Sequence, residues 1–111
     1  MKLRFQEFPT FYIFQKPYGL RTHAVANDQV GFVETLSEKL QQKLFVVHRL
    51  DKGTSGLILF AKDSTSAQSL AEHFQARDVL KNYLFLTDKK HSEDSFTIKS
   101  HIEKIGNEFF V

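Results

Sequence analysis

A polar run between two apolar runs dominates this sequence: Val46-Val47-His48-Arg49-Leu50-Asp51-Lys52-Gly53-Thr54-Ser55-Gly56-Leu57-Ile58-Leu59-Phe60-Ala61-Lys62. Leu44–Val47 has strand character, and Gly56–Ala61 is a continuous apolar run typical of a buried strand. The polar residues between them should therefore lie at the rim of a sheet, where rigid strands often hold catalytic groups. Asp51-Lys52-Gly53 also fits a plain turn, and spacing alone leaves that interpretation open.

The residues before this segment predict one strand and one helix. Phe11–Lys16 is a short aromatic and β-branched run that stops at Pro17, as a strand running into a turn does. The polar stretch Leu20–Gln29 reads as a loop. Apolar residues then recur at helical spacing, which predicts an amphipathic helix over Phe32–Gln42.

The residues after this segment predict a second helix and more strands. Asp63 or Ser64 can cap a helix that ends near Arg77, with one apolar face made of Ala67, Leu70, Ala71 and Phe74. Strands are expected over Val79–Thr87 and Phe96–Glu103, and a turn at Gly106-Asn107 precedes a strand starting at Glu108. The charged run 88–94 reads as a solvated loop. This order predicts an α+β fold with a mixed, largely antiparallel sheet and two flanking helices.

Composition sets the class of protein but not its activity. The chain has 111 residues, with 41% hydrophobic and 25% charged, which fits one globular domain or a piece of a larger one. A net charge of +2 is compatible with a polyanionic partner without indicating one. The lack of cysteine excludes disulfides, thiolate zinc sites and cysteine nucleophiles. We see no signal peptide or membrane-spanning run and expect a cytoplasmic protein.

Several familiar catalytic motifs fit the sequence badly. The run His48-Arg49-Leu50-Asp51 differs from a kinase catalytic loop because Leu50 separates Arg49 from Asp51, and no glycine-rich phosphate loop precedes it. The sequence has no P-loop and no HExxH motif, and its five histidines lack the pairing of metal ligands. A Ser-His-Asp triad could be drawn only by choosing residues freely. We therefore expect no metal.

The central segment resembles the signature of the RluA-type pseudouridine synthases. The matching residues are His48-Arg49-Leu50-Asp51-x-x-Thr54-Ser55-Gly56-Leu57-x-Leu59-x-Ala61-Lys62. Two flanking segments agree in order, Lys16-Pro17-x-Gly19 with His23, and Arg77 followed by Lys81-x-Tyr83. The resemblance is strongest over residues 11–88. The His48 start and the Ala61-Lys62 end favour this branch over the related RsuA branch.

The resemblance implies that residues 1–111 are the N-terminal portion of a pseudouridine synthase catalytic domain. Such an enzyme converts a specific uridine of structured ribosomal or transfer RNA to pseudouridine without cofactor or metal. No DNA or membrane partner is expected. Asp51 matches the family's aspartate, which attacks C1′ of the ribose or C6 of the uracil, or stabilises the detached base. A carboxylate suits these roles when it is ionised beside a cation.

The resemblance also implies roles for other residues. Arg49 should enter the RNA stack in place of the flipped nucleotide, since the glycosidic bond is inaccessible inside a stacked helix. Tyr83 matches the family's active-site tyrosine and is expected as the second catalytic residue, stacking on the flipped base with a part in proton transfer, although a tyrosine at this place also fits a strand core. The other expected RNA contacts are His48, Lys16, His23, Lys52 and Arg77, each of which also fits a plain solvated or structural side chain. Thr54, Ser55 and Gly56 should shape the loop that holds Asp51.

The sequence departs from the family pattern in one important respect. Family members continue with a segment like Gly-Arg-x-His-Gln-Ile-Arg, which supplies a basic partner for the aspartate, and none occurs before Val111. The chain also ends on apolar residues, so we expect it to be the first part of something longer and its catalytic domain to be incomplete. Two hypotheses follow: an RNA-modifying isomerase, or a catalytically incomplete fragment or remnant that only binds RNA or a protein partner.

Overall fold

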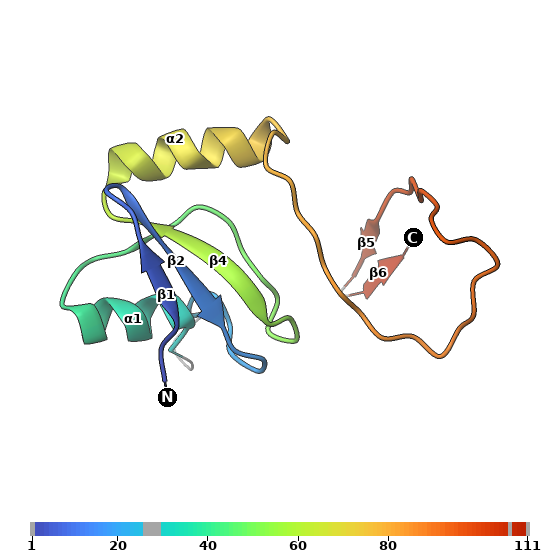
Figure 1. The fold of residues 1–111 in the computed structure, drawn as a ribbon, viewed down its shortest axis with the longest axis horizontal. Helices are drawn as coiled ribbons and strands as arrows, with labels where there is room; N and C mark the ends of the chain where they lie inside the picture. The colour runs from blue at the N-terminus through green and yellow to red at the C-terminus, as the bar shows by residue number, and fades with distance from the viewer. Residues whose placement is uncertain (1, 26–29, 107, 111) are drawn as a thin grey trace. The chain divides into compact units, whose positions relative to one another are not determined.

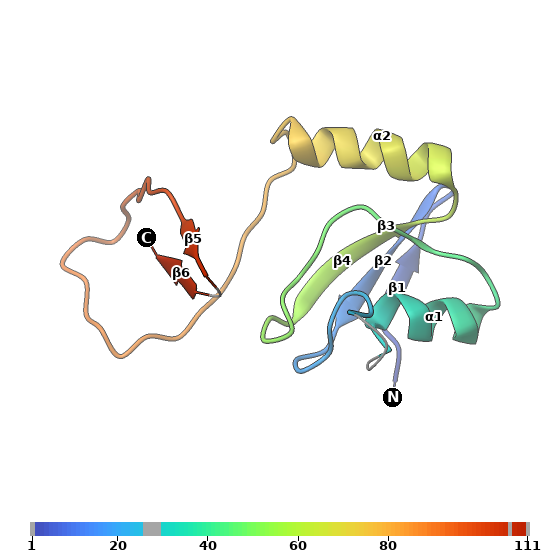
Figure 2. The same ribbon diagram turned by 180° about the vertical axis from the view of Figure 1, so that it is seen from behind.

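The computed structural model describes residues 2–25, 30–106 and 108–110, which fall into two units, Met1–Lys81 and Asn82–Val111. The first unit contains the strands β1 (Phe5–Glu7), β2 (Phe11–Lys16), β3 (Phe45–Val46) and β4 (Gly56–Ala61) and the helices α1 (Phe32–Leu40) and α2 (Ser64–Gln75). Figures 1 and 2 show the strands running between α1 and α2. This confirms the predicted α+β class with two flanking helices.

The sheet of the first unit has four strands in the order β1-β2-β4-β3, and its three pairings are all antiparallel. The longest ladder joins β2 to β4 and runs from the pair Phe11–Ala61 to the pair Lys16–Gly56. Strands six residues long and rich in aromatic and branched side chains suit such a ladder. Because this ladder ends at Gly56, the polar segment before it lies at the end of the sheet.

The core lies between one face of the sheet and α1. Alternate residues of β2 and β4 point into it, among them Phe14 and Phe60, and α1 adds Phe32 and Leu36. These four side chains have no exposed surface, and Phe14, Phe32 and Phe60 form a cluster with ring centroids about 6 Å apart. Three of the twelve phenylalanines of the sequence therefore meet in this core.

The start of α1 is tied to the loop after β2. The first helical N–H groups, of Phe32 and Val33, donate to the carbonyls of Arg21 and Thr22. Gly31 precedes the helix without a side-chain cap, and a Cβ atom at this position would lie 2.4 Å from the carbonyl carbon of His23. Position 31 must therefore be glycine, because the backbone of His23 lies too close for a side chain. The two hydrogen bonds from the start of α1 hold residues 21–23 in place.

Helix α2 packs less deeply than α1. The Asp63 carboxylate caps it by accepting from the N–H of Ser66 at 2.7 Å, as predicted, and this bond lowers the pKa of Asp63. None of its residues is fully buried, but the Phe74 ring stacks on the His48 ring with centroids 4.3 Å apart. Beyond the cap residue Ala76, Arg77 has φ +60°, the left-handed conformation usual for glycine after a helix.

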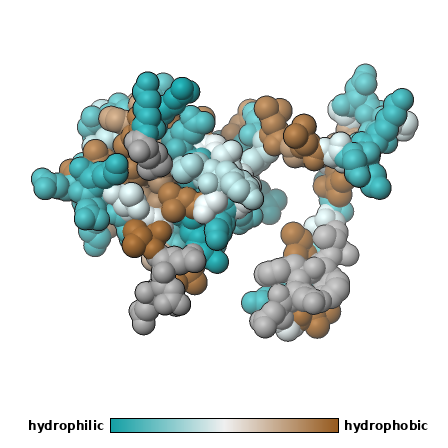
Figure 3. Space-filling view, turned by 90° about the horizontal axis from the view of Figure 1, so that it is seen from below, coloured by the Kyte–Doolittle hydropathy of each residue, from teal (hydrophilic) through white to brown (hydrophobic). Residues whose placement is uncertain are grey.

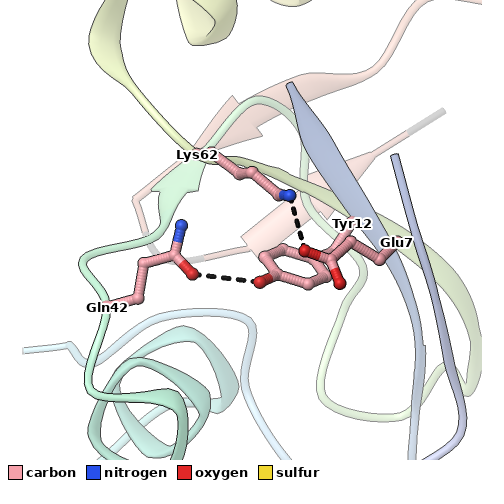
Figure 4. Close-up of polar contacts among 4 residues, drawn as sticks. All are labelled: Glu7, Tyr12, Gln42 and Lys62. Atoms are coloured by element: carbon pink, nitrogen blue, oxygen red, sulfur yellow. Dashed lines mark hydrogen bonds and ion pairs between the residues drawn. The ribbon is translucent and has the colours of Figure 1, made fainter. Parts of the chain in front are cut away.

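Two polar contacts tie the elements together on one side of the core (Figure 4). The Tyr12 hydroxyl on β2 donates to the side-chain carbonyl of Gln42 at 3.0 Å, which links the sheet to the end of α1. Lys62 donates to Glu7 on β1 at 2.7 Å, and its ammonium lies 4.6 Å from the centre of the Tyr12 ring. The ion pair lowers the pKa of Glu7.

The second unit contains a two-stranded antiparallel sheet of β5 (Glu103–Ile105) and β6 (Glu108–Phe110). The prediction of a strand over Val79–Thr87 is wrong, because the described residues 79–102 contain no helix or strand. The prediction over Phe96–Glu103 is also wrong, apart from its last residue. Several large apolar side chains here are exposed, namely Leu84, Phe85, Leu86, Ile98 and Ile102. Figure 3 shows hydrophobic residues, in brown, on the surface of the protein.

Other boundaries differ in smaller ways from the predictions. The sequence did not reveal β1, and α1 ends at Leu40 because Gln41 adopts a left-handed conformation. The strand expected over Leu44–Val47 shortens to β3, while the strand from Glu108 is confirmed as β6. The positions 26–29, 107 and 111 of the predicted loop, turn and last strand lie outside the described residues. Among the described helices, none is long and apolar enough to cross a membrane.

Candidate active site

The candidate site is the loop from His48 to Ser55, which connects β3 to β4. The side chains of its first four residues are alternately buried in the fold and exposed to solvent. His48 is half-buried and Leu50 is only 6% exposed, whereas Arg49 and Asp51 are exposed. Arg49 and Asp51 therefore expose their guanidinium and carboxylate, and both residues line the same small cleft.

Thr22 fixes Leu50 from the neighbouring loop. Its buried hydroxyl donates to the carbonyl of Leu50 at 2.7 Å and accepts from the N–H of Leu50 at 3.0 Å. Both backbone groups of a buried residue are thus satisfied by one side chain. Because α1 holds Thr22 in turn, the position of the loop depends on the helix.

Two further hydrogen bonds and one glycine conformation define the rest of the loop. The N–H of Thr54 donates to the carbonyl of Asp51 at 3.0 Å, which closes a turn. The N–H of Gly19 donates to the carbonyl of Lys52 at 2.8 Å and joins the turn after β2 to this loop. Gly56 has φ +140°, a conformation that other residues rarely adopt, where the loop enters β4. The expected shaping of the loop by the side chains of Thr54 and Ser55 stays a prediction.

His48 has internal partners. Its Nε2 accepts from the N–H of Leu59 on β4 at 2.9 Å, and its ring stacks on Phe74. Burial, and to a lesser degree the positive charge of Lys81, lowers the pKa of His48 to about 4. The ring is therefore neutral near pH 7.

Lys16 lies inside the fold, next to the same loop. It ends β2, has no exposed surface, and its ammonium donates to the carbonyls of Pro17, at 3.1 Å, and Leu20, at 2.5 Å. Burial lowers the pKa of Lys16, and the negative charge of Asp51 partly offsets that effect. A cation thus lies near Asp51 within this chain, in a place that leaves no exposed surface for a phosphate contact.

A small cleft of about 70 Å³ opens at Asp51. It is lined by Arg21, Thr22, His23, Val25, Arg49, Leu50, Asp51 and Lys52. Three of the residues predicted for the site besides Asp51 meet here, namely Arg49, Lys52 and His23. A larger cavity of about 240 Å³ beside Lys2, Arg4 and Gln15 does not include the loop. The cleft therefore combines one carboxylate with several basic side chains, a setting suited to a polyanion.

The structure does not bring all predicted site residues together. Arg77 is exposed at the end of α2, and it is not among the residues lining the cleft. Tyr83 belongs to the second unit and is 57% exposed, so its approach to Asp51 stays a prediction. Sequence reasoning missed Thr22 and Arg21, because a threonine and an arginine in a polar loop carry no signal of their role. In the described part of the chain, no cluster of side chains could hold a metal ion.

Comparisons with known proteins agree with this arrangement. Residues 10–110 match the family described as RNA pseudouridylate synthase. The chain is 32% identical over 102 residues to the tRNA pseudouridine synthase C of Haemophilus ducreyi, covering 85% of this chain and 41% of that protein. It is 37% identical over 91 residues to the ribosomal large subunit pseudouridine synthase C of Rickettsia bellii, covering 80% and 30%.

A solved structure, the human RNA Pseudouridylate Synthase Domain Containing 4, is similar in fold. It has a TM-score of 0.56 and 29% sequence identity, over 66% of this chain and 29% of the human chain. The chain therefore spans less than half the length of each of these relatives.

Proposed function

The chain belongs to the RNA pseudouridylate synthase family, and from this membership we propose that its Asp51 loop takes part in converting a uridine of structured RNA to pseudouridine. Two of the relatives are named for transfer RNA and for the large ribosomal subunit, so these two RNAs are the proposed substrate class. The cytoplasm is the proposed compartment, in keeping with a chain that lacks cysteine.

The proposed reaction is an isomerisation in which Asp51 is the catalytic carboxylate. The N1–C1′ glycosidic bond breaks, the uracil turns, and a C5–C1′ bond forms. C5 then loses its proton and N1 gains one, so that no atom is lost overall. Asp51 forms a transient bond to C1′ or C6, or balances the positive charge that develops on the ribose. The proposal needs no cofactor or metal.

The placement of Asp51 is the observation that carries this proposal. The carboxylate is exposed at a cleft, while the backbone on both sides of it is bonded to Thr22, Gly19 and Thr54. A rigid loop keeps the reacting oxygen in one place, and such positioning accounts for much of catalysis. The buried ammonium of Lys16 lies close enough to interact electrostatically with Asp51.

The remaining residues are proposed to bind the RNA. Arg49 is exposed beside Asp51 and suits the place of a flipped nucleotide in the stack. Lys52 and His23 line the same cleft and suit its phosphates. Arg77, which does not line the cleft, is proposed to contact a phosphate elsewhere on the RNA. Tyr83 is proposed to stack on the flipped base.

Release of tritium from RNA labelled at C5 of uridine tests the proposal. We expect Asp51→Asn to abolish release, because an amide is a poor nucleophile and carries no charge. Asp88→Asn, which removes a carboxylate from the charged run 88–94, is the control and should retain release. Tritium release by Asp51→Asn at the wild-type rate would contradict the assignment.

The short span relative to the relatives favours a second candidate, a segment that binds RNA without completing the reaction. The same assay separates the two candidates. Binding of RNA without tritium release by these 111 residues, together with release by a C-terminally extended chain, would support the second candidate. Release by the 111 residues themselves would exclude it.

A further inference from the structure

His48 lies at the point where β3 stops pairing with β4. The ladder ends with the Val46–Phe60 pair. The N–H of Leu59, the next residue of β4 toward the loop, donates to the His48 ring and not to a strand carbonyl. The imidazole thus replaces the backbone acceptor that a longer β3 would supply, and the chain is free to turn away into the loop.

This bond determines the protonation state of the ring. A backbone N–H can only donate, so Nε2 of His48 must carry a lone pair and the ring proton must be on Nδ1. The ring also stacks on Phe74 at an angle of 13° between planes, and the ammonium of Lys81 lies 5.6 Å from the centre of the Phe74 ring. This cation opposes a positive charge on the imidazole.

The two inward residues of the loop have complementary anchors. His48 is held by β4 and α2, and Leu50 is held by Thr22. Arg49 and Asp51 alternate with them and face outward. Because exposure alternates along residues 48–51, fixing His48 and Leu50 from inside restricts the directions in which Arg49 and Asp51 can point.

We propose that His48 is a positioning residue, a neutral imidazole protonated on Nδ1 that fixes Arg49 and Asp51 from inside and does not contact RNA. The inference rests on the proposed function because that function is what makes the position of Asp51 matter. The protonation state and the contacts of the His48 ring do not depend on the proposed function. It replaces the expected RNA contact of His48 with an internal role.

The first test is ¹⁵N NMR of the histidine rings in the wild-type protein, which needs no catalysis and no variant. We expect the neutral Nδ1–H form of His48 throughout about pH 5 to 8. A titration midpoint near the ordinary histidine value, or a proton on Nε2, would overturn the proposal. If the protein has no isomerase activity, the proposed function fails while this test still decides the state of His48.

The second test separates positioning from RNA contact. His48→Phe keeps a flat ring against Phe74 but leaves the N–H of Leu59 without its acceptor, whereas His48→Gln retains an acceptor. We expect His48→Phe to slow single-turnover pseudouridine formation by about tenfold or more, with the Kd for RNA within about twofold of wild type. His48→Gln should recover part of the rate.

Arg49→Ala is the comparison for a direct contact, and its main effect should be on Kd. The proposal is wrong if His48→Phe weakens RNA binding as much as Arg49→Ala does and leaves the bound rate unchanged.

Discussion

The hydroxyl of Thr22 makes two hydrogen bonds to one buried residue, Leu50, and we expect its loss to be costly. Thr22→Val keeps the shape of the side chain but leaves a buried N–H and a buried carbonyl without partners. Unsatisfied buried groups of this kind cost about 1–3 kcal/mol. Urea denaturation should show the free energy of unfolding lowered by that amount.

Thr35→Val is the matched control for this substitution. The Thr35 hydroxyl donates to the carbonyl of Gly31, which also accepts from the N–H of Thr35. Its removal leaves that carbonyl with a partner, so the loss of stability should be smaller. If Thr22→Val and Thr35→Val lowered the free energy of unfolding equally, the hydrogen bonds to Leu50 would not contribute more to stability than the bond to Gly31.

His48 gives the fold a dependence on acid. The pKa of its ring is about 4 in the folded protein and about 6.5 when unfolded, so folding favours the neutral form. This contribution is complete above pH 6.5 and is lost as the pH falls toward 4. The loss should be roughly 2–3 kcal/mol, reduced by partial exposure of the ring.

The measurement is the difference in unfolding free energy between wild type and His48→Gln from about pH 7 to pH 4. The stability of the wild type relative to His48→Gln should decrease as the pH is lowered. His73 acts in the opposite direction, because its bond to Asp78 raises its pKa and that contribution is lost as the pH rises. A difference between wild type and His48→Gln that does not change with pH would contradict the assigned state of His48.

At the scale of residues, the sequence predicted the polar loop and Asp51 but not what supports them. The motif around Asp51 is local, so a linear pattern can identify it. Lys16 and His48 were expected at the RNA because they are basic, yet their side chains point into the fold. Whether a basic residue lies inside depends on partners distant in sequence, such as Leu59 and Phe74, that no local pattern reveals.

The end of α2 contains a conformation that suits glycine better than its present residue. Arg77 adopts φ +60° directly after the helix, which costs a non-glycine residue roughly 1 kcal/mol. Arg77→Gly should therefore raise the free energy of unfolding by up to that amount, as measured by urea denaturation. If Arg77 binds phosphate as proposed, the same change weakens RNA binding.

Arg77→Ala separates these two effects. Alanine removes the charge but keeps the backbone penalty, so it should weaken RNA binding to the same degree without raising stability. Binding unaffected in both variants would remove Arg77 from the RNA-binding set.

Elements with a packing partner were predicted better than elements without one. The apolar alternation of β2 and β4 and the spacing in α1 all face a common core, so the sequence pattern and the structure agree. Residues 79–87 have similar strand-forming side chains but no pairing partner among the described residues, and they form no strand. Strand propensity needs a neighbouring strand to take effect, and a single sequence does not show which strand that is.

The chain as a whole should respond unevenly to protease. The first unit holds the hydrophobic core, while residues 79–102 contain no helix or strand and expose several large side chains. Limited trypsin treatment should cut first at Lys89, Lys90 or Lys99 and leave a resistant fragment that ends near Lys81. Mass spectrometry of the fragments is the measurement. Early cleavage at Lys16 or Lys62 would show that the core is less stable than its packing indicates.

The inward and outward alternation from His48 to Asp51 has a consequence for changes in length. Deleting one residue between these two positions would bring the carboxylate into the buried place of Leu50, beside the Thr22 hydroxyl. A substitution can leave the spacing between His48 and Asp51 unchanged, but the deletion of one residue cannot. The segment should thus tolerate changes of chemistry at Lys52 far better than any change in its number of residues.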